Sequence, residues 1–210
     1  MRFRPAHGVV IERRLNRANR RDGGRIAAAV FSDDGLFRLL FPDDGLRRGG
    51  VARLHRGLLA AIPRTTTVSS ISLGGKLAGC SLWVPPLAWP YPRSFYVRSQ
   101  IQSARLIRSH AMNNQAALAF IAEVSSHHEQ GPHFYLQLLM VDPAHQRRGF
   151  GDQLLAPGLA AADREGVPCV LETQAERNLA YYARHGFAVT AVTTDPTNTA
   201  TMWTMVRQPR

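Results

Sequence analysis

The residues best placed to do chemistry form the string Gln146-Arg147-Arg148-Gly149-Phe150-Gly151. It follows a β-rich apolar run over residues 134–141 and the strand-ending pair Asp142-Pro143, and an Ala/Leu-rich segment of helical character comes after it. The glycines let a ligand approach the backbone, and the first turn of a helix offers unpaired N–H groups to an anion. The two arginines add formal positive charge. Strand, basic glycine loop and helix together predict an anion-binding site.

The glycine spacing excludes two common phosphate-binding loops. The chain has no G-x-x-x-x-G-K-[ST] string, and the dinucleotide fingerprint G-x-G-x-x-G lacks its third glycine because Leu154 stands at that position. A different phosphate-binding loop is therefore expected here.

The whole string resembles the Q/R-x-x-G-x-G/A pyrophosphate loop of the GNAT superfamily of N-acetyltransferases. Downstream, Leu171-Glu172-Thr173 looks like the fifth strand of that family, and residues 178–187 look like its N-x-x-x-Y-x-x-x-G-F helix end. Within the superfamily, residues 134–207 look most like the puromycin N-acetyltransferase type. The resemblance is close over the C-terminal third and loose over the N-terminal half, so it bears on fold and cofactor more than on substrate.

The resemblance implies a mixed α/β chain with the GNAT fold, in one domain over residues 1–210. We expect a central twisted, mostly antiparallel sheet of about seven strands, one parallel βαβ unit that binds acyl-CoA, and helices on both faces. Residues 133–187 would form the acetyl-CoA-binding core, and residues 1–25 a basic N-terminal segment. The charge of residues 2–25 lies far in sequence from the motif and resembles a solvated face, so we expect these residues to be dispensable for cofactor binding.

Acetyl-CoA is the cofactor that the resemblance implies, with no metal. Its pyrophosphate would lie on the amides of residues 146–151, beside Arg147 and Arg148. Its pantetheine arm would pair with the backbone of Leu139, Met140 and Val141 like an added β-strand, and an N–H there would polarise the thioester carbonyl. Asn178 matches the asparagine that contacts the cofactor in the family.

A tyrosine is expected to protonate the departing CoA thiolate. Tyr182 matches the tyrosine of the family, four residues before Gly186-Phe187, and shares a helix face with Asn178. Spacing alone leaves Tyr181 open as well, and only the family register selects Tyr182.

The acceptor amine must lose a proton to a general base, and the sequence offers several candidates for this base. Glu172, at the end of the fifth strand, is the leading candidate, and a buried structural acid is an equal interpretation of it. Glu123, Tyr135 and water are the alternatives.

Two features of the helix after the loop depart from a simple pattern. Asp152 stands where many relatives carry a small hydroxyl residue, and a carboxylate close to phosphate is unfavourable, although Asp suits a first helical turn. Pro157-Gly158 interrupts the middle of the helix, as a similar pair does in the puromycin-type enzymes.

The amino-acid composition limits the kinds of partner and the cellular location that we expect. The net charge is +11, with Lys76 the sole lysine, but the charge is scattered outside residues 2–25, so we expect no nucleic-acid partner. No apolar run approaches the ~20 residues of a membrane span, and the N-terminus has no secretory h-region, so we expect no membrane association and a cytoplasmic location. Cys80 and Cys169 are expected to be reduced, partly buried thiols.

Other segments give coarser expectations. Adjacent histidines point to different helical faces, so His127-His128 with Glu129 indicates a solvated helix end rather than a metal site. By resemblance, Phe31, Asp33 and Phe37 border a substrate pocket, or else they are caps and core. Trp83 and Trp89 stack on an aromatic acceptor, or belong to the core or rim.

Hydrophobic periodicity and turn residues predict the remaining elements. The expected helices are Arg25 to Phe31 (restarting after a break at Gly23-Gly24), Leu36 to Phe41 (capped by Ser32-Asp33-Asp34), Val51 to Ile62, Gln100 to His110, Asn113 to His128 and Glu176 to His185. The expected strands are Gly8 to Asn16, a hairpin of Thr67 to Leu73 with Lys76 to Val84, Val167 to Thr173, Phe187 to Thr194 and Thr201 to Arg207.

The sequence therefore favours an acetyl-CoA-dependent N-acetyltransferase that acts on a primary amine of a small molecule, as a monomer or homodimer. The alternative is a GNAT-fold acyl-CoA-binding sensor or interaction module with little turnover. A basic nucleic-acid-associated protein is a third hypothesis, and it would require a steeply salt-dependent affinity for DNA.

Overall fold

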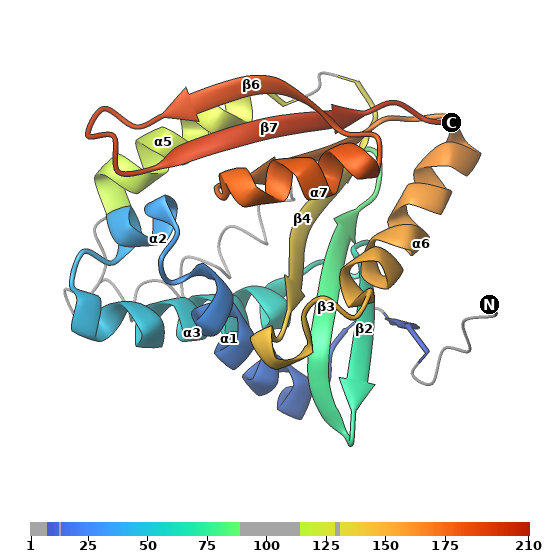
Figure 1. Ribbon diagram of the computed structural model, residues 1–210, viewed down its shortest axis with the longest axis horizontal. Helices are drawn as coiled ribbons and strands as arrows, with labels where there is room; N and C mark the ends of the chain where they lie inside the picture. The colour runs from blue at the N-terminus through green and yellow to red at the C-terminus, as the bar shows by residue number, and fades with distance from the viewer. Residues whose placement is uncertain (1–7, 13, 89–113, 129–130) are drawn as a thin grey trace.

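The computed structural model describes residues 8–12, 14–88, 114–128 and 131–210 (Figure 1). The expected helix over residues 100–110, Trp89 and Glu129 lie outside the described residues. In chain order the elements are β1 (Val10–Glu12), α1 (Arg17–Phe31), α2 (Gly35–Leu40), α3 (Asp44–Ala61), β2 (Thr67–Leu73), β3 (Lys76–Val84), α5 (Asn114–Ser126), β4 (Phe134–Val141), the 3₁₀ turn η1 (Pro143–His145), α6 (Phe150–Glu165), β5 (Cys169–Thr173), the 3₁₀ turn η2 (Glu176–Asn178), α7 (Leu179–Arg184), β6 (Ala188–Thr194) and β7 (Thr201–Arg207).

The described strands form one seven-stranded sheet in the order β1-β2-β3-β4-β5-β7-β6. Its neighbouring strands are antiparallel except for β4 and β5, which are parallel and are joined through α6. Helices α1 and α3 lie on one side of β3 and β4, and α6 lies on the other (Figure 1). The expected mixed α/β architecture, with one parallel βαβ unit and helices on both faces, is confirmed.

Strand β4 divides the core between the two faces. Leu138 and Met140 pack with residues of α1 and α3, whereas Leu139 and Val141 pack against Phe150 at the start of α6. This alternation follows from the two-residue period of a strand that is covered on both sides. The long apolar run in the sequence therefore corresponds to the central strand.

The hairpin of β2 and β3 has the predicted bounds. Gly74 and Gly75 form its turn with φ of +55° and +76°. Two positive φ values in a two-residue loop define a type I′ turn, which matches the right-handed twist of the flanking strands. Glycine is needed at both positions because larger residues rarely adopt this conformation.

The predicted break at Gly23-Gly24 is wrong, because α1 runs through both residues. A Cβ at Gly23 would lie 2.5 Å from Leu59 Cδ1, and a Cβ at Gly24 would lie 2.5 Å from the carbonyl oxygen of Ala52. Both neighbours belong to α3. The glycines let the two helices approach closely, and this packing offsets their low helix propensity.

Part of the basic N-terminal segment belongs to the folded core, whereas its dispensability for cofactor binding stays a prediction. Its second half is part of α1, and Gly23 and Gly24 are buried in the core. Arg25 reaches the residue that follows β4, where its Nη2 donates to Asp142 Oδ2 over 2.6 Å. Truncation at residue 25 would therefore remove half of a core helix.

Helix α6 is continuous through Pro157, so the expected interruption does not occur. The adjacent Gly158 lies directly on the ring of Trp83, where a Cβ would overlap the indole. Trp83 is only 1% exposed, so its interpretation as a core residue is confirmed and stacking on an acceptor is excluded. Helix α3 also begins earlier than predicted, at Asp44, with the side chain of Asp43 accepting from the Leu46 amide.

Candidate active site

Strands β4 and β5 separate after a short parallel ladder. Residues 134–136 of β4 face residues 169–171 of β5, and no further pairing joins these strands in the described structure. Strand β4 continues beside β3 as far as Val141, after a register shift that leaves Gln137 as an extra, bulged residue. Over residues 138–141, the edge that points toward β5 therefore has no described strand beside it and is available to a ligand backbone.

A cavity of about 220 Å³ lies at this separation. Its described walls come from α1, α2 and α3 on one side and from β4, β5, β7 and α7 on the other. The lining residues are Phe31, Asp34, Leu36, Phe37, His55, Tyr135, Leu136, Gln137, Leu138, Leu139, Glu172, Thr173, Gln174, Asn178, Tyr182 and Met202. Five residues singled out from the sequence for cofactor or catalysis meet here: Tyr135, Leu139, Glu172, Asn178 and Tyr182.

The two tyrosines of α7 face different surroundings. Tyr182 is buried and lines the cavity, and burial raises the pKa of its phenol, so the hydroxyl stays protonated at neutral pH. Tyr181 lies instead against the loop, where a Cβ on Gly151 would be 2.7 Å from its hydroxyl. Burial and the nearby Asp152 raise the pKa of Tyr181 as well.

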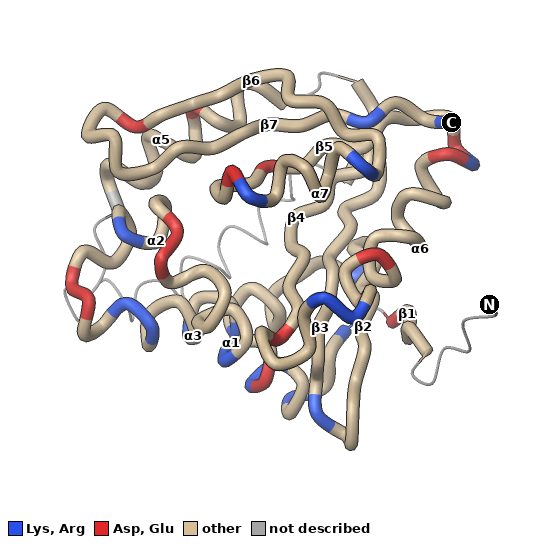
Figure 2. Tube along the Cα trace, in the orientation of Figure 1, with Lys and Arg blue, Asp and Glu red and all other residues tan. Residues whose placement is uncertain are grey.

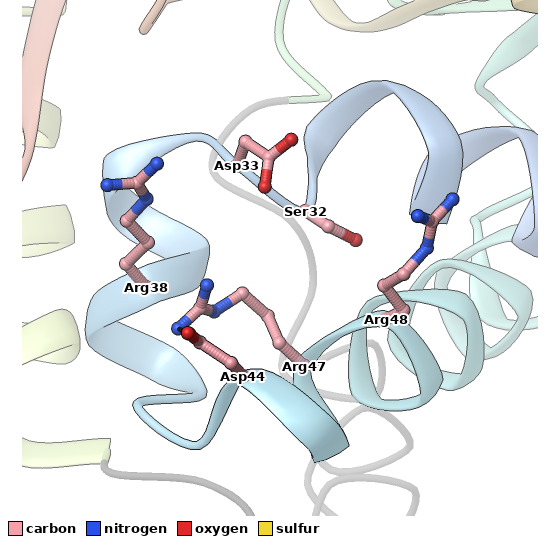
Figure 3. Close-up of a pocket in the computed structure, with 6 residues that line it drawn as sticks. All are labelled: Ser32, Asp33, Arg38, Asp44, Arg47 and Arg48. Atoms are coloured by element: carbon pink, nitrogen blue, oxygen red, sulfur yellow. Dashed lines mark hydrogen bonds and ion pairs between the residues drawn. The ribbon is translucent and has the colours of Figure 1, made fainter.

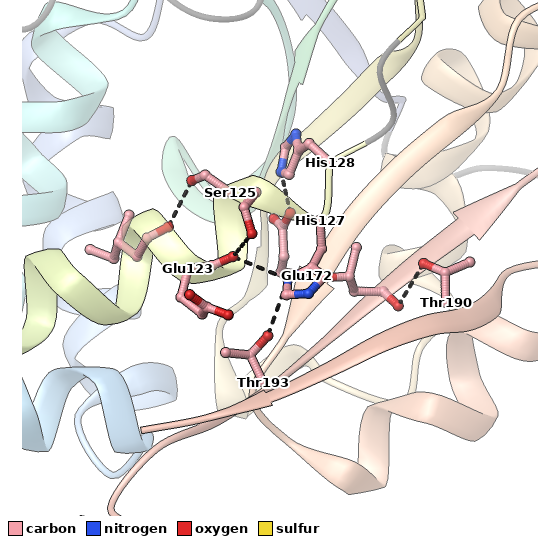
Figure 4. A network of polar contacts seen from close by, with 10 residues as sticks. Glu123, Ser125, His127, His128, Glu172, Thr190 and Thr193 are labelled. Atoms are coloured by element: carbon pink, nitrogen blue, oxygen red, sulfur yellow. Dashed lines mark hydrogen bonds and ion pairs between the residues drawn. The ribbon is translucent and has the colours of Figure 1, made fainter. Parts of the chain in front are cut away.

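Glu172 forms a buried ion pair with Nε2 of His128, which follows the C-terminal end of α5 (Figure 4). The ring of His128 also packs edge-on against Tyr135, with a centroid distance of 4.9 Å. The interpretation of His128 as part of a solvated helix end is therefore wrong. It applies to the exposed His127, whose Nδ1 lies 3.1 Å from the Glu123 carbonyl oxygen.

The other two base candidates differ in position. Tyr135 lines the cavity, whereas Glu123 is exposed on α5 and is not among the described lining residues. Of the candidates named from the sequence, Glu172 and Tyr135 are thus the ones that the cavity brings together.

The loop of residues 146–151, called the anion loop below, has an unusual backbone conformation. Gly149 is the N-cap of α6 with φ of +76°, and nothing lies within 4 Å of a Cβ built on it. Arg147 also has a positive φ, of +59°, and the side chains of Arg147 and Arg148 are exposed. The backbone amides in the first turn of α6 therefore lie next in sequence to two exposed arginine side chains.

Other side chains of the loop serve to shape it. Gln146 Nε2 donates to the carbonyl of Val141 over 3.2 Å, which ties the loop to the end of β4. Phe150 is the first residue of α6, and its side chain is buried against β2 and β3, so only its backbone is available to a ligand. Met140 is likewise buried in the opposite core, and its contribution to a ligand would come from the backbone alone.

The start of the loop is fixed by Asp142. Burial alone would raise the pKa of this carboxyl, but the hydrogen bonds from Arg25 and from the Ala144 amide outweigh burial and lower it. Asp142 is therefore a carboxylate that holds η1 and α1 together at neutral pH.

Asp152 and Asn178 each have a partner within the site. Asp152 is exposed in the first turn of α6, and its Oδ1 lies 3.0 Å from Nε2 of His185 at the end of α7. Asn178 Nδ2 donates to Thr173 Oγ1 over 3.1 Å, which joins η2 to the end of β5. These contacts connect α7 to both the loop and the cavity.

The acceptor-side residues divide between two hollows. Phe31 and Phe37 line the cavity, together with Asp34. Asp33 does not; it lines a separate depression of about 450 Å³ with Arg38 and Arg47 among its neighbours (Figure 3). Asp34 therefore takes the place that the sequence interpretation gave to Asp33.

A third depression, of about 420 Å³, is strongly basic. It lies between α1 and α3 and is lined by Arg17, Arg20, Arg21, Arg53, Arg56, Gly57 and Ala60. Elsewhere the charged residues are spread over many elements (Figure 2). The basic run at the N-terminus is thus extended by arginines of α3, which the sequence did not indicate.

No group of three or more His, Cys, Asp or Glu side chains suited to a metal occurs in the described residues. None of the described helices is both long and apolar enough to span a bilayer. Cys80 and Cys169 are free and buried, and burial raises the pKa of each thiol to about 12.

Some cavity residues were missed at the level of sequence. His55 shares a helical face with Val51 and Leu59 at a spacing of four, so its burial was readable from the pattern. Asp34 and Gln174 gave no comparable signal, because their place depends on how α2 meets the end of β5.

Comparison with known proteins agrees with this geometry. Residues 110–189 match the family model described as an acetyltransferase (GNAT) domain, and acetyl-CoA is the cofactor of that family. The chain is similar in fold to a Corynebacterium glutamicum structure described as histone acetyltransferase HPA2 and related acetyltransferase, with 20% identity, a TM-score of 0.65 and 97% of each chain covered.

Two further solved structures share the fold. A putative GNAT-family acetyltransferase from Desulfovibrio desulfuricans has 15% identity and a TM-score of 0.54, covering 96% of this chain and 99% of its own. The PaiA N-acetyltransferase from Thermoplasma acidophilum, in complex with coenzyme A, has 12% identity and a TM-score of 0.53, with the same coverage. The described structure therefore has the GNAT acetyltransferase fold, and its C-terminal half carries the matching domain.

Proposed function

We propose that this protein is an acetyl-CoA-dependent N-acetyltransferase that acetylates a primary amine of a small molecule. The observation that carries the proposal is the edge of β4 over residues 138–141, beside which the described residues place no further strand. It leads directly into the anion loop at one end and lies beside a cavity with Tyr182 and Glu172 at the other.

The residues present fit acetyl-CoA at each end of the site. The positive-φ Gly149 and the first amides of α6 suit a pyrophosphate, with Arg147 and Arg148 beside them. The backbone from Leu139 to Val141 has no described strand on its β5 side, and extended ligands join strand edges of this kind. Gln146 Nε2 already binds the Val141 carbonyl, so a ligand would have to share or replace that contact. When bound, acetyl-CoA supplies an activated acetyl group as a thioester.

Tyr182 and Glu172 have the placement for the two proton transfers. The raised pKa of Tyr182 keeps its proton available for the sulfur of the leaving thiolate. Glu172 lines the same cavity and accepts the proton of the acceptor amine, directly or through water. An N–H of β4 donates to the thioester oxygen as the amine attacks.

The test combines binding and turnover. Acetyl-CoA at concentrations near ~1 mM should raise the melting temperature, because a ligand that binds only the native state stabilises it by mass action. A panel of primary amines with acetyl-CoA, followed by release of the CoA thiol, should then identify an acceptor. No thermal response would overturn the cofactor assignment, whereas a response without turnover on any amine would favour an acyl-CoA-binding sensor.

A further inference from the structure

Asp34 occupies the N-cap position of α2 but does not cap the helix. Its side chain makes no capping hydrogen bond, although aspartate is among the preferred N-cap residues. The amide of Leu36, in the first turn, is bound instead by Gln174 Oε1 from the end of β5, over 2.6 Å. The usual role of the Asp34 carboxylate is therefore taken by another residue.

Asp34, whose carboxylate makes no capping hydrogen bond, lines the cavity described above. Asp34 is partly buried, and burial raises its pKa to about 6, while Arg177 acts in the opposite direction and Asp33 and Arg38 have smaller effects. It is consequently ionised at pH 7.5, in surroundings that disfavour an unpaired negative charge. A cation in the cavity would relieve this cost.

The wall beside Asp34 is apolar and uncharged. The rings of Phe31 and His55 are stacked, with centroids 5.3 Å apart, and Phe37 lies 5.3 Å from His55. Burial lowers the pKa of His55 to about 4, so its imidazole is neutral at pH 7.5. Leu36 and Met202 add further apolar surface.

The acids of the described lining are Asp34 and Glu172, and the described lining contains neither Lys nor Arg. Glu172 is paired with His128, so Asp34 is the acid whose charge the described lining leaves for a ligand to balance. An acceptor carboxylate would meet like charge with no described cation in the lining to balance it, which is costly in a partly desolvated site. The volume of about 220 Å³ is also below the roughly 300–1,000 Å³ of pockets for drug-sized ligands.

We propose that the acceptor is a compact primary amine with an apolar body and no carboxylate, and that Asp34 is the residue that selects it. The inference rests on the proposed acetyl transfer for its biological meaning, but the binding selectivity that it predicts can be measured without turnover.

The experiment uses three ligands that differ in one group. 2-Phenylethylamine has the amine and the ring, L-phenylalanine adds a carboxylate, and L-phenylalaninamide replaces that carboxylate by a neutral amide. Each is titrated calorimetrically into the CoA-saturated protein at pH 7.5, and each is tested for thiol release with acetyl-CoA. We expect L-phenylalanine to bind about 100-fold more weakly than 2-phenylethylamine, with the amide recovering most of the loss.

The Asp34→Asn variant should bind 2-phenylethylamine about 10-fold more weakly and should discriminate less than about 10-fold against L-phenylalanine. Asp33→Asn is the matched control, because Asp33 is exposed and lines a different depression; it should behave as the parent does. Urea unfolding of both variants confirms that they are folded.

Three results would overturn the inference: binding of L-phenylalanine as tightly as 2-phenylethylamine, unchanged selectivity in folded Asp34→Asn, or no binding of any of the three ligands. Selective, Asp34-dependent binding without thiol release would uphold the inference and count against acetyl transfer. Thiol release that is equally fast with L-phenylalanine would uphold acetyl transfer and reject the inference.

Discussion

His128 and Glu172 form an ion pair between the end of α5 and β5, and both side chains are more than 90% buried. Glu172 lines the cavity, and its contact with His128 fixes the direction of the carboxylate. Removing one partner of a buried pair leaves an uncompensated charge or forces a change of protonation, and this commonly costs about 3–5 kcal/mol. The pair therefore stabilises the junction of α5 with the sheet and positions Glu172.

His128→Ala should lower the free energy of unfolding by about 3–5 kcal/mol. His127→Ala is the adjacent control, and it should change stability by less than about 0.5 kcal/mol because that side chain is exposed. Urea unfolding followed by circular dichroism measures both. Equal stability of the two variants would show that the ion pair contributes little in solution.

Tyr182→Phe should lower kcat by about 10²–10⁴-fold if the hydroxyl protonates the departing thiolate. The ring would still pack in the core, so stability and acetyl-CoA affinity should change little. Steady-state rates with an accepted amine measure the effect.

Tyr181→Phe is the internal control for this experiment. The Tyr181 hydroxyl lies against Gly151 rather than in the described cavity lining, so kcat should be close to that of the parent. If Tyr181→Phe lost activity while Tyr182→Phe kept it, Tyr181 would be the acid that protonates the thiolate. Two active variants would assign protonation to water or to another group.

Gly149→Val should abolish the thermal response to acetyl-CoA. The φ of +76° disfavours any side chain, and a branched Cβ would also obstruct the approach of a phosphate to the backbone. Gly166→Val is the matched control, because Gly166 caps the other end of α6 with φ of +66° and has nothing within 4 Å of a Cβ. It should lose similar stability yet keep the response; retained binding in folded Gly149→Val would place the anion site elsewhere.

The sequence predicted elements well where their signals are local. The hairpin turn at Gly74-Gly75 and the strand of residues 134–141 each depend on a few neighbouring residues. The bounds of β4 and of the hairpin strands were accordingly predicted to the residue.

The errors arose where distant segments meet. Gly23-Gly24 looked like a helix break because propensity is local, whereas the contact with α3 that retains these glycines is not. His128 looked solvated because its partner, Glu172, is brought to it only by the fold. The loss of the cap at Asp34 likewise depends on Gln174, from another element.

Substitution by alanine distinguishes a helical glycine that contacts another helix closely from one that is exposed to solvent. Gly24→Ala should destabilise the protein by about 1–3 kcal/mol, because the added Cβ would lie 2.5 Å from a backbone oxygen of α3. Gly49→Ala, within α3 and exposed with nothing within 4 Å, should instead stabilise it by about 0.5–1 kcal/mol. Thermal unfolding measures both, and a stabilising Gly24→Ala would contradict the close approach of α1 and α3.

Asp34 should make stability depend on pH in a defined window. Its pKa is about 6 in the folded protein against 3.8 as the reference value, chiefly because of burial. The native state therefore binds more protons than the unfolded state between about pH 4 and pH 6, and the contribution of Asp34 to stability falls as pH rises through this range. Asp34→Asn has no carboxylate to desolvate and escapes this loss.

The stability of Asp34→Asn relative to the parent should therefore increase from pH 4 to pH 7.5, as measured by urea unfolding at several pH values. Only the pH-dependent part is diagnostic, since asparagine is itself a good N-cap and can add a constant offset. Asp33→Asn removes a neighbouring exposed carboxylate and reports the effect of net charge alone. A difference between Asp34→Asn and the parent that is flat with pH, or that matches Asp33→Asn, would mean that the Asp34 carboxylate is solvated and does not face an enclosed cavity.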